Sequence, residues 1–203
     1  MWNRLRYTVW APLYDVMVSA VHFDEARRRS IARLCLGAGG RVLLVGAGTG
    51  LDLDFLPSGA DVTAVDVTPA MLRRLEARAA RLGRPVSAQV ADARHLPFAD
   101  ASFDAVVLHL ILAVMPEPER GLREAARVLR PGGRIAVFDK YLREGERPSL
   151  PRRLANVVAR PLFSDLNRRL ESWLAATPLR VEVEEPVALG GMYRLATLRK
   201  PAP

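Results

Sequence analysis

Three short stretches of this sequence place glycine or aspartate directly after an apolar run. The turn Gly46–Gly50 follows "RVLLV", Asp66 ends "DVTAVD", and Asp92 ends "PVSAQVAD". Glycines let a backbone approach a ligand closely, and an acidic residue about twenty positions further on can accept hydrogen bonds from both hydroxyls of a ribose. A carboxylate after the third run could receive an exocyclic amino group. Together the three stretches predict a site for an adenosine-like ligand.

Two other nucleotide classes fit this turn poorly. The dinucleotide fingerprint Gly-x-Gly-x-x-Gly needs glycine or alanine at position 51, where this chain has Leu51. A Walker phosphate loop needs Gly-Lys-Ser/Thr, which the sequence lacks. The turn also offers no evident contact for a pyrophosphate, so nicotinamide dinucleotides and nucleoside triphosphates are disfavoured.

The elements around these stretches alternate between strands and helices. Helical spacing, caps and glycine or proline stops predict helices over 24–36 with Asp24 as N-cap, 50–56, 68–83 with Thr68 as N-cap, and 116–130. Apolar runs predict strands over 41–46, 61–66, 85–92, 103–112 and 134–139. Such alternation is typical of a parallel sheet that is covered on both faces. Ligands in open sheets of this kind lie beyond the carboxyl ends of the strands, where all three stretches fall.

The C-terminal part has a different rhythm. Helices are predicted over about 149–159 and 163–176, followed by strands over 180–189 and 192–200. Only the short turn at Gly190 and Gly191 separates these two strands, so they must form an antiparallel hairpin. The sheet is therefore predicted to be mixed, with an antiparallel strand near one edge. With 203 residues and no internal repeat, the chain is expected to form one domain over 1–203.

Four segments together resemble a known family. In order, "LLVGAGTG", "VTAVDVTPAML", "ADARHLPFADASFDAVV" and "EAARVLRPGGRIAVFD" are similar to the successive motifs of class I S-adenosylmethionine-dependent methyltransferases, and the resemblance covers about residues 7–140. It implies a Rossmann-like α/β fold: a seven-stranded mixed sheet with helices on both faces and an antiparallel last strand. It also implies S-adenosylmethionine as the cofactor.

The resemblance assigns roles by position. Residues implied to bind the cofactor are Gly46, Ala47, Gly48 and Gly50 at the methionine part, Asp66 at the ribose, Val67 and Met71 beside the adenine, Asp92 and Ala93 at the adenine edge, and His109 facing both cofactor and substrate. One position departs from the family, which usually has an acidic residue where this chain has Leu44. That acid helps to hold the methionine amino group, and Thr49 and Asp52 are the candidates to replace it.

The N-terminus carries a second resemblance. "YTVWAPLYD", with Tyr7, Tyr14 and Asp15, is similar to the start of quinone C-methyltransferases and of bacterial phospholipid N-methyltransferases. This implies that residues 1–36 form lid or interfacial helices, with Tyr14 among the cofactor-binding residues. Residues 1–20 independently show tryptophans and aliphatic residues on one side with Arg4 and Arg6, a pattern suited to a membrane interface. A lid that packs its apolar face on the sheet edge remains the alternative.

The expected chemistry is mostly alignment, because a sulfonium activates its own methyl group. An ethanolamine headgroup must first lose a proton, for which His109 and Tyr14 are candidate acceptors, with Tyr7 or Tyr141 as orienting groups. The tyrosines could instead hold a cationic ammonium. His109 fits equally well as a hydrogen-bonded residue in the cofactor wall. Lys140, Tyr141 and Arg143 are either donors to a lipid phosphate or a solvated loop. No cluster has metal-ligand spacing, so no metal is expected.

Charge and cysteine content bound the partners and the compartment. The net charge of +8 suits an anionic membrane surface, although it is nearly all arginine and coding bias explains it equally well. Nucleic acid is disfavoured because no basic strand carries interleaved aromatic residues. A single cysteine, Cys35, and no apolar run long enough to cross a bilayer predict a cytoplasmic protein, with peripheral contact at the inner face of the membrane left open.

These features favour a methyltransferase acting on a lipid-like or small hydrophobic acceptor, with phosphatidylethanolamine-type phospholipid as the best candidate. C-methylation of a quinone or of another small hydrophobic acceptor is the alternative within the family. A non-catalytic protein that uses the same fold to bind a membrane or a partner is the alternative from another class, and Leu44 is the feature that favours it. The sequence does not determine the oligomeric state.

Overall fold

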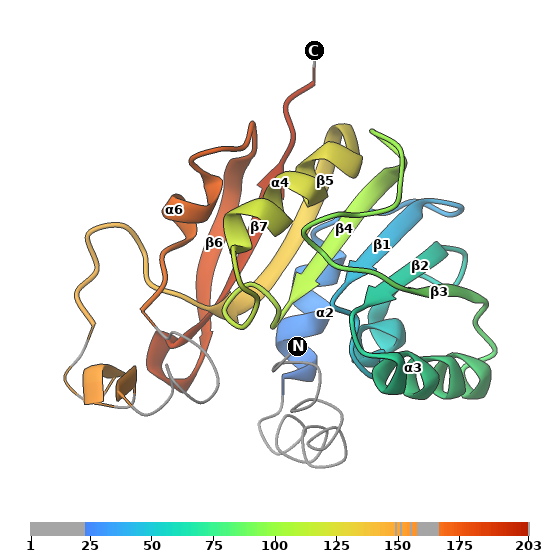
Figure 1. The fold of residues 1–203 in the computed structure, drawn as a ribbon, viewed down its shortest axis with the longest axis horizontal. Coiled ribbons are helices and arrows are strands. Elements are labelled where there is room, and N and C mark those ends of the chain that lie inside the picture. Colours follow the sequence, from blue (N-terminus) through green and yellow to red (C-terminus); the bar gives the residue numbers. More distant parts are fainter. Residues whose placement is uncertain (1–22, 149, 151, 155, 158–166, 203) are drawn as a thin grey trace.

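The computed structural model describes residues 23–148, 150, 152–154, 156–157 and 167–202. They form one seven-stranded sheet in the order β3-β2-β1-β4-β5-β7-β6 (Figure 1). The strands are β1 (Arg41–Val45), β2 (Asp61–Asp66), β3 (Val86–Val90), β4 (Phe103–His109), β5 (Leu129–Lys140), β6 (Arg180–Ala188) and β7 (Tyr193–Arg199). Strands β1 to β5 pair in parallel, whereas β7 runs antiparallel to both β5 and β6. The predicted mixed sheet with an antiparallel last strand is confirmed.

The helical elements lie on both sides of this sheet (Figure 1). They are α2 (Asp24–Ala32), η1 (Leu51–Phe55), α3 (Pro69–Arg81), α4 (Pro118–Val128), α6 (Leu170–Leu174) and η2 (Leu189–Gly191). Residues 150, 152–154 and 156–157 are also helical. Among the described residues, no helix is both long and apolar enough to cross a bilayer.

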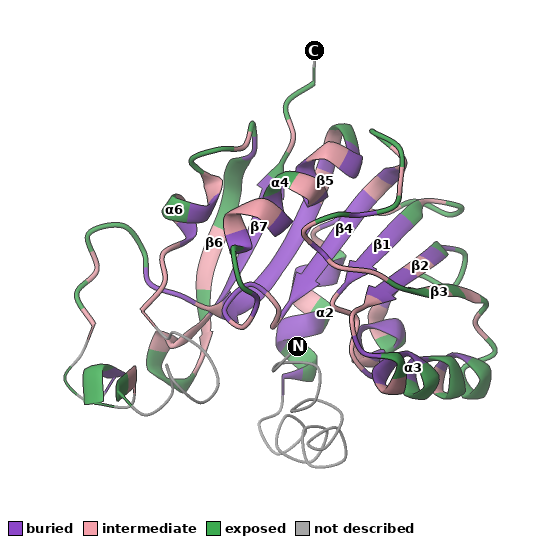
Figure 2. Ribbon diagram, viewed as in Figure 1, coloured by how far each residue is buried: buried purple, intermediate pink, exposed green. Residues whose placement is uncertain are grey.

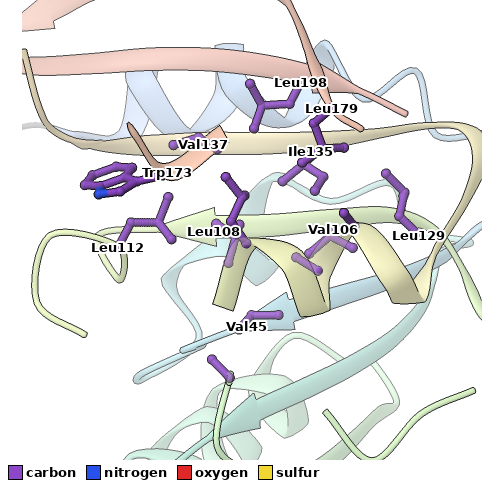
Figure 3. Packing of buried hydrophobic residues seen from close by; sticks show 14 of the residues in the cluster. Val45, Val106, Leu108, Leu112, Leu129, Ile135, Val137, Trp173, Leu179 and Leu198 are labelled. Atoms are coloured by element: carbon purple, nitrogen blue, oxygen red, sulfur yellow. The ribbon is translucent and has the colours of Figure 1, made fainter. Parts of the chain in front are cut away.

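The central strands carry runs of buried apolar residues, as expected where both faces of a sheet are covered (Figure 2). In β1, Leu43 and Val45 pack in one cluster with α4 and α6, while Val42 and Leu44 pack in the other with α2 and α3. Figure 3 shows the first cluster, in which Trp173 of α6 lies near Leu112. These two cores fix the strand ends that carry the site.

Several element boundaries differ from the sequence predictions. The strand predicted over 103–112 ends at His109, because Leu110 adopts a left-handed conformation with φ of 58°. The first described helix ends at Ala32 rather than at residue 36, and its N-cap is Phe23, so Asp24 is the first helical residue. Strand β5 begins at Leu129 instead of Arg134.

The early start of β5 has a structural cause beyond the local sequence. The Gly132 N–H donates to the carbonyl of Lys200, and the Lys200 N–H donates to the carbonyl of Gly133. The helix predicted over 116–130 spans only Pro118–Val128, so the segment "PGG" does not end it as predicted. This segment lies inside β5 and pairs with the chain that follows β7.

Candidate functional site

The three chemistry-bearing turns meet at the carboxyl edge of the sheet. The Gly48 N–H donates to Oδ2 of Asp66 over 3.0 Å, which joins the glycine turn after β1 to the end of β2. The Ala91 N–H donates to the Asp66 carbonyl over 3.2 Å, which joins β2 to the residue before Asp92. Adjacent parallel strands therefore bring the turns into contact, as the sequence predicted.

The glycines of the turn have two different uses. All three have positive φ, which favours glycine. An added Cβ at Gly46 would lie 2.6 Å from Ile111, and one at Gly50 would lie 2.9 Å from Leu75, so these two positions are small because protein atoms pack on them. A Cβ at Gly48 would meet no atom within 4 Å. Space above Gly48 is therefore open, as a ligand that approaches this backbone requires.

Backbone donors hold the Asp66 carboxylate in place at the end of β2. Its Oδ1 accepts the Thr68 N–H over 2.8 Å while its Oδ2 accepts the Gly48 N–H. Burial raises the pKa of Asp66, although these backbone donors act in the opposite direction. Thr68 is the N-cap residue of α3 as predicted, but its side chain makes no capping bond. Val67 follows Asp66 directly, and Met71 is buried in the first turn of α3.

Asp92 has a partner that the sequence analysis missed. Arg94 donates to both of its carboxylate oxygens through the side chain, with Nη2 to Oδ2 at 2.7 Å, and to Oδ1 through its N–H at 2.9 Å. The Arg94 hydrogen bonds hold the pKa of Asp92 below its usual value. Nη1 of Arg94 also reaches Glu117. An adenine amino group would therefore share Asp92 with Arg94, while the neighbouring Ala93 belongs to the core.

His109 lies in a buried polar network. Its Nδ1 is 2.7 Å from Oδ1 of Asp52, and its Nε2 is 3.0 Å from Oγ of Ser30. Nη1 of Arg27 reaches the same Oδ1 of Asp52 over 2.6 Å. The His109 side chain is only 1% exposed, so neither ring nitrogen faces solvent. This geometry favours the predicted alternative, a hydrogen-bonded residue in the site wall, over a general base.

Asp52 is the charged member of this network. Burial alone would raise the pKa of Asp52, but the charge of Arg27 and the hydrogen bonds from Arg27 and His109 outweigh it, so the pKa lies well below its usual value. Thr49, the other candidate to replace the missing acid, is buried in the same turn. Leu44, in contrast, is 1% exposed and packs in the core with α2 and α3.

The rim beyond β5 differs from the prediction. Tyr141 is fully buried against Trp173, and its hydroxyl has no hydrogen-bond partner in the described part of the chain. Burial also raises its pKa. Since the side chain is buried, neither alternative predicted for Tyr141, a donor to a lipid phosphate or part of a solvated loop, is correct. Lys140 lies over the ring of Tyr193, with Nζ 5.8 Å from the ring centroid. Arg143 is exposed, and its Nε lies 3.1 Å from Glu184.

A cavity of about 650 Å³ opens beside this rim. Its position follows from the register, because Arg194 pairs with Asp139 near the end of β5 and with Pro186 of β6. The cavity thus lies at the same edge of the sheet as the glycine turn. Its lining combines positive and negative side chains: Arg143, Glu144, Glu146, Glu171, Glu184, Pro186 and Arg194.

The predictions for the N-terminal lid and for metal binding are not tested by the contacts described above. Tyr7 and Tyr14 lie outside the described residues, as do most of the proposed lid helices over 1–36. Within the described ranges, no group of three or more His, Cys, Asp or Glu side chains could hold a metal ion.

Comparison with known proteins identifies the family to which this chain belongs. A family model described as a methyltransferase domain matches residues 43–137. A phosphatidylethanolamine N-methyltransferase of Cereibacter sphaeroides is 35% identical over 190 residues, covering 92% of this chain and 92% of that relative. The chain belongs to the class I S-adenosylmethionine-dependent methyltransferases. It is therefore an enzyme whose cofactor is S-adenosylmethionine.

Other relatives of this methyltransferase show what the family leaves open. A demethylmenaquinone methyltransferase of Corynebacterium urealyticum is 39% identical over 130 residues, covering 62% of this chain and 54% of that relative. The crystal structure of the [4+2]-cyclase SpnF has the same fold, with a TM-score of 0.72 at 23% identity, covering 89% of this chain and 81% of that one. Because a cyclase shares the fold, the fold alone does not determine the reaction. The methyltransferase assignment rests on the sequence relatives.

Proposed function

We propose that this methyltransferase transfers a methyl group to the amine of a phosphatidylethanolamine-type phospholipid. The observation that carries the proposal is the match to the Cereibacter sphaeroides enzyme, because that match spans nearly the whole of both chains. Residues that select the acceptor usually lie outside the cofactor motifs, so a match over the whole length bears on the acceptor more than a match to the motifs alone.

The described residues supply binding and alignment in this reaction. When bound, S-adenosylmethionine supplies a methyl group that is already activated, so the protein has to position a neutral amine in line with it. Asp66 and the open backbone at Gly48 hold the cofactor side. Both ring nitrogens of His109 are engaged by Asp52 and Ser30, so its role is to hold the Asp52 side chain in position. Of the predicted proton acceptors, His109 and Tyr14, we therefore retain Tyr14, with Tyr7 as its orienting group; both tyrosines lie outside the described residues.

The charged cavity beside β5 suits the headgroup of such a lipid. A phosphoethanolamine headgroup carries one negative phosphate and one positive ammonium. Arg143 is exposed at the cavity rim, and the guanidinium N–H groups that do not face Glu184 are its donors for the phosphate. The glutamates of the lining already accept from protein donors, as Glu184 does from Arg194, and their remaining lone pairs are the acceptors for the ammonium. A quinone carries neither charge and gains nothing from this lining.

A short apolar face supports contact with a lipid surface. In the helical segment after β5, Leu150, Leu154 and Val157 are 67%, 64% and 72% exposed, and their spacing puts them on one face of the helix. Arg147 and Arg153 are exposed beside them and suit anionic headgroups. The face complements the N-terminal interfacial helix predicted from the sequence, and it favours peripheral association with the membrane.

Methyl transfer to vesicles tests the acceptor. The full chain is incubated with labelled S-adenosylmethionine and with vesicles of phosphatidylethanolamine and phosphatidylglycerol, of phosphatidylglycerol alone, or of phosphatidylglycerol with demethylmenaquinone. Label is expected in lipid only where phosphatidylethanolamine is present. Label that enters only the quinone would replace this proposal with quinone C-methylation, the second candidate that the Corynebacterium urealyticum relative supports.

A pair of variants tests the cavity. Arg143→Ala should raise KM for phosphatidylethanolamine vesicles about tenfold with little change in kcat, because it removes a charge-assisted contact made in the ground state. Arg123→Ala, an exposed arginine on α4, is the matched control and should leave both constants unchanged. Equal effects of the two substitutions would mean that overall charge, rather than the cavity, attracts the substrate.

A further inference from the structure

Asp52 is placed to take over the role of the acidic residue that this chain lacks at position 44. We propose that Asp52 supplies the anionic contact for the ammonium group at the methionine end of the cofactor, and that Arg27 and His109 are the positioning residues that hold it there. The inference concerns the cofactor and is independent of which acceptor the enzyme methylates.

The location of Asp52 follows from two neighbouring elements. It lies in the first turn of η1, directly after the glycine turn, which is closed by a hydrogen bond from the Gly50 N–H to the Ala47 carbonyl. On its other side is His109, the last residue of β4, and β4 pairs with β1 in parallel. Asp52 therefore lies between the glycine turn and the carboxyl end of β4, at the methionine side of the site.

The hydrogen-bond pattern leaves one oxygen of Asp52 for a ligand. Arg27 Nη1 and His109 Nδ1 both reach Oδ1, over 2.6 Å and 2.7 Å. Oδ2 has lone pairs that neither contact uses, and an ammonium group is a donor of the matching charge. Because two donors already bind Oδ1, the carboxylate group is fixed in orientation. Binding of a third donor to Oδ2 therefore costs little conformational entropy.

Ser30 completes the network by fixing the ring of His109. Whether the imidazole carries one proton or two, Nδ1 must be the donor to the Asp52 carboxylate, and Nε2 then pairs with the Ser30 hydroxyl. Ser30 and Arg27 are three residues apart on the buried side of α2. Helix α2 therefore helps to hold the carboxylate that recognises the cofactor. An acidic residue at position 44 of β1 would not need this support from α2.

Because position 44 holds leucine, the acidic contact for the ammonium group has to come from another residue. The Leu44 side chain is 1% exposed and packs with apolar residues between the sheet and the helices α2 and α3. It offers no acceptor, so an ammonium group near the turn must find its anion in another element. The Arg27 charge and its hydrogen bond keep Asp52 ionised at neutral pH despite burial.

A binding cycle tests this role without using activity. Calorimetry measures S-adenosylhomocysteine and its des-amino analogue, which lacks only the α-amino group, on the wild-type protein and on Asp52→Asn. The wild type should prefer S-adenosylhomocysteine by about 10- to 100-fold, as expected for a hydrogen bond to a charged group. In Asp52→Asn this preference should fall below about threefold, while affinity for the des-amino ligand changes little.

The control is Asp54→Asn, which changes the same chemical group two residues further along η1. Asp54 points to Arg78 of α3, so this variant should keep the full preference of the wild type. If Asp52→Asn does not fold, as judged by circular dichroism, Asp52→Glu is used, because it keeps the charge in the network but displaces it; it too should lose most of the preference.

Three outcomes overturn the proposal. The first is a wild-type protein that binds the two ligands equally. The second is a variant that loses affinity for both ligands to the same extent, which would make Asp52 purely structural. The third is a variant that keeps the preference. Since no lipid is present in this experiment, a negative vesicle assay would not alter its result.

Discussion

Gly48→Ala separates the ligand-facing role of the glycine turn from its packing role. The added methyl group meets no protein atom within 4 Å, so the only cost to the unliganded fold is the left-handed backbone, with φ of 54° at this position. That conformation costs a residue with a Cβ about 1–2 kcal/mol. In a chain of 203 residues, the loss corresponds to a fall in Tm of about 2–8 °C.

The effect on cofactor binding should be larger than this stability loss suggests. The methyl group occupies the space through which the ligand approaches the backbone, and forcing a methyl group into a packed contact costs about 1–3 kcal/mol. The dissociation constant for S-adenosylhomocysteine should therefore rise about 5- to 150-fold, measured by calorimetry at a temperature well below Tm.

Gly83→Ala is the matched control for this experiment. Gly83 also has a positive φ, 61°, and an added Cβ there also meets nothing within 4 Å, but it follows the far end of α3. It should show a similar fall in Tm with unchanged affinity. Normal affinity in Gly48→Ala, or an equal loss of affinity in both variants, would refute the reasoning that the open space above Gly48 receives the cofactor.

Three further variants test other parts of the molecule. Asp66→Ala should weaken binding of S-adenosylhomocysteine by at least about tenfold in calorimetry, because the ribose loses a charged acceptor; unchanged affinity would contradict the assigned role. The double variant Leu150→Gln, Leu154→Gln should reduce co-sedimentation with anionic vesicles several-fold, whereas Leu82→Gln, at the exposed end of α3, should not; equal binding by both would argue against the apolar face. Burial raises the pKa of Asp139 above the usual value of an aspartate carboxyl. Its contribution to the free energy of unfolding is therefore fully present below the usual pKa and is lost as the pH rises through the raised pKa. Tm of Asp139→Asn should therefore depend less on pH in the acidic range than Tm of the wild type, and parallel curves would exclude this explanation.

The sheet and the cofactor edge were predictable because their signals are local. Strands such as Arg41–Val45 are apolar on both faces, and each is followed by a turn whose residue types carry the chemistry. Once the strands are parallel, their carboxyl ends must share one edge, so Gly48, Asp66 and Asp92 meet without any further information. The antiparallel hairpin was equally predictable, since two residues of turn allow no crossover.

The network around Asp52 was not predictable in the same way. Asp52, Arg27, Ser30 and His109 come from three elements, and the contact between Ser30 and His109 spans 79 positions of sequence. Arg27 belongs to a run of three arginines that reads as a solvated helix face, yet the fold buries it while Arg28 stays exposed. Which arginine of such a run is buried depends on how α2 docks on the sheet, and sequence periodicity does not determine that.

Strand ends set by non-glycine residues escaped prediction for a related reason. Leu110 continues the apolar run after His109, so nothing in its type marks the end of the strand. In the left-handed conformation its N–H donates to the Phe138 carbonyl over 2.7 Å, a contact with β5 that local sequence does not reveal. Tyr141 was misplaced for a similar cause, because a tyrosine just beyond a strand is compatible with either a rim or a core position.

The place of β7 in the sheet affects how the chain is assembled during translation. This strand is synthesised after β6 but lies between β6 and β5 in the sheet. Strand β6 can therefore pair only after the ribosome has extended the chain past Arg199 and β7 has left the exit tunnel. Until then the nascent chain exposes two unpaired sheet edges, which are the kind of surface that trigger factors and other holdase chaperones shield. Stop codons introduced between β6 and β7 should accordingly yield aggregating products even though every residue of the cofactor motifs has been synthesised.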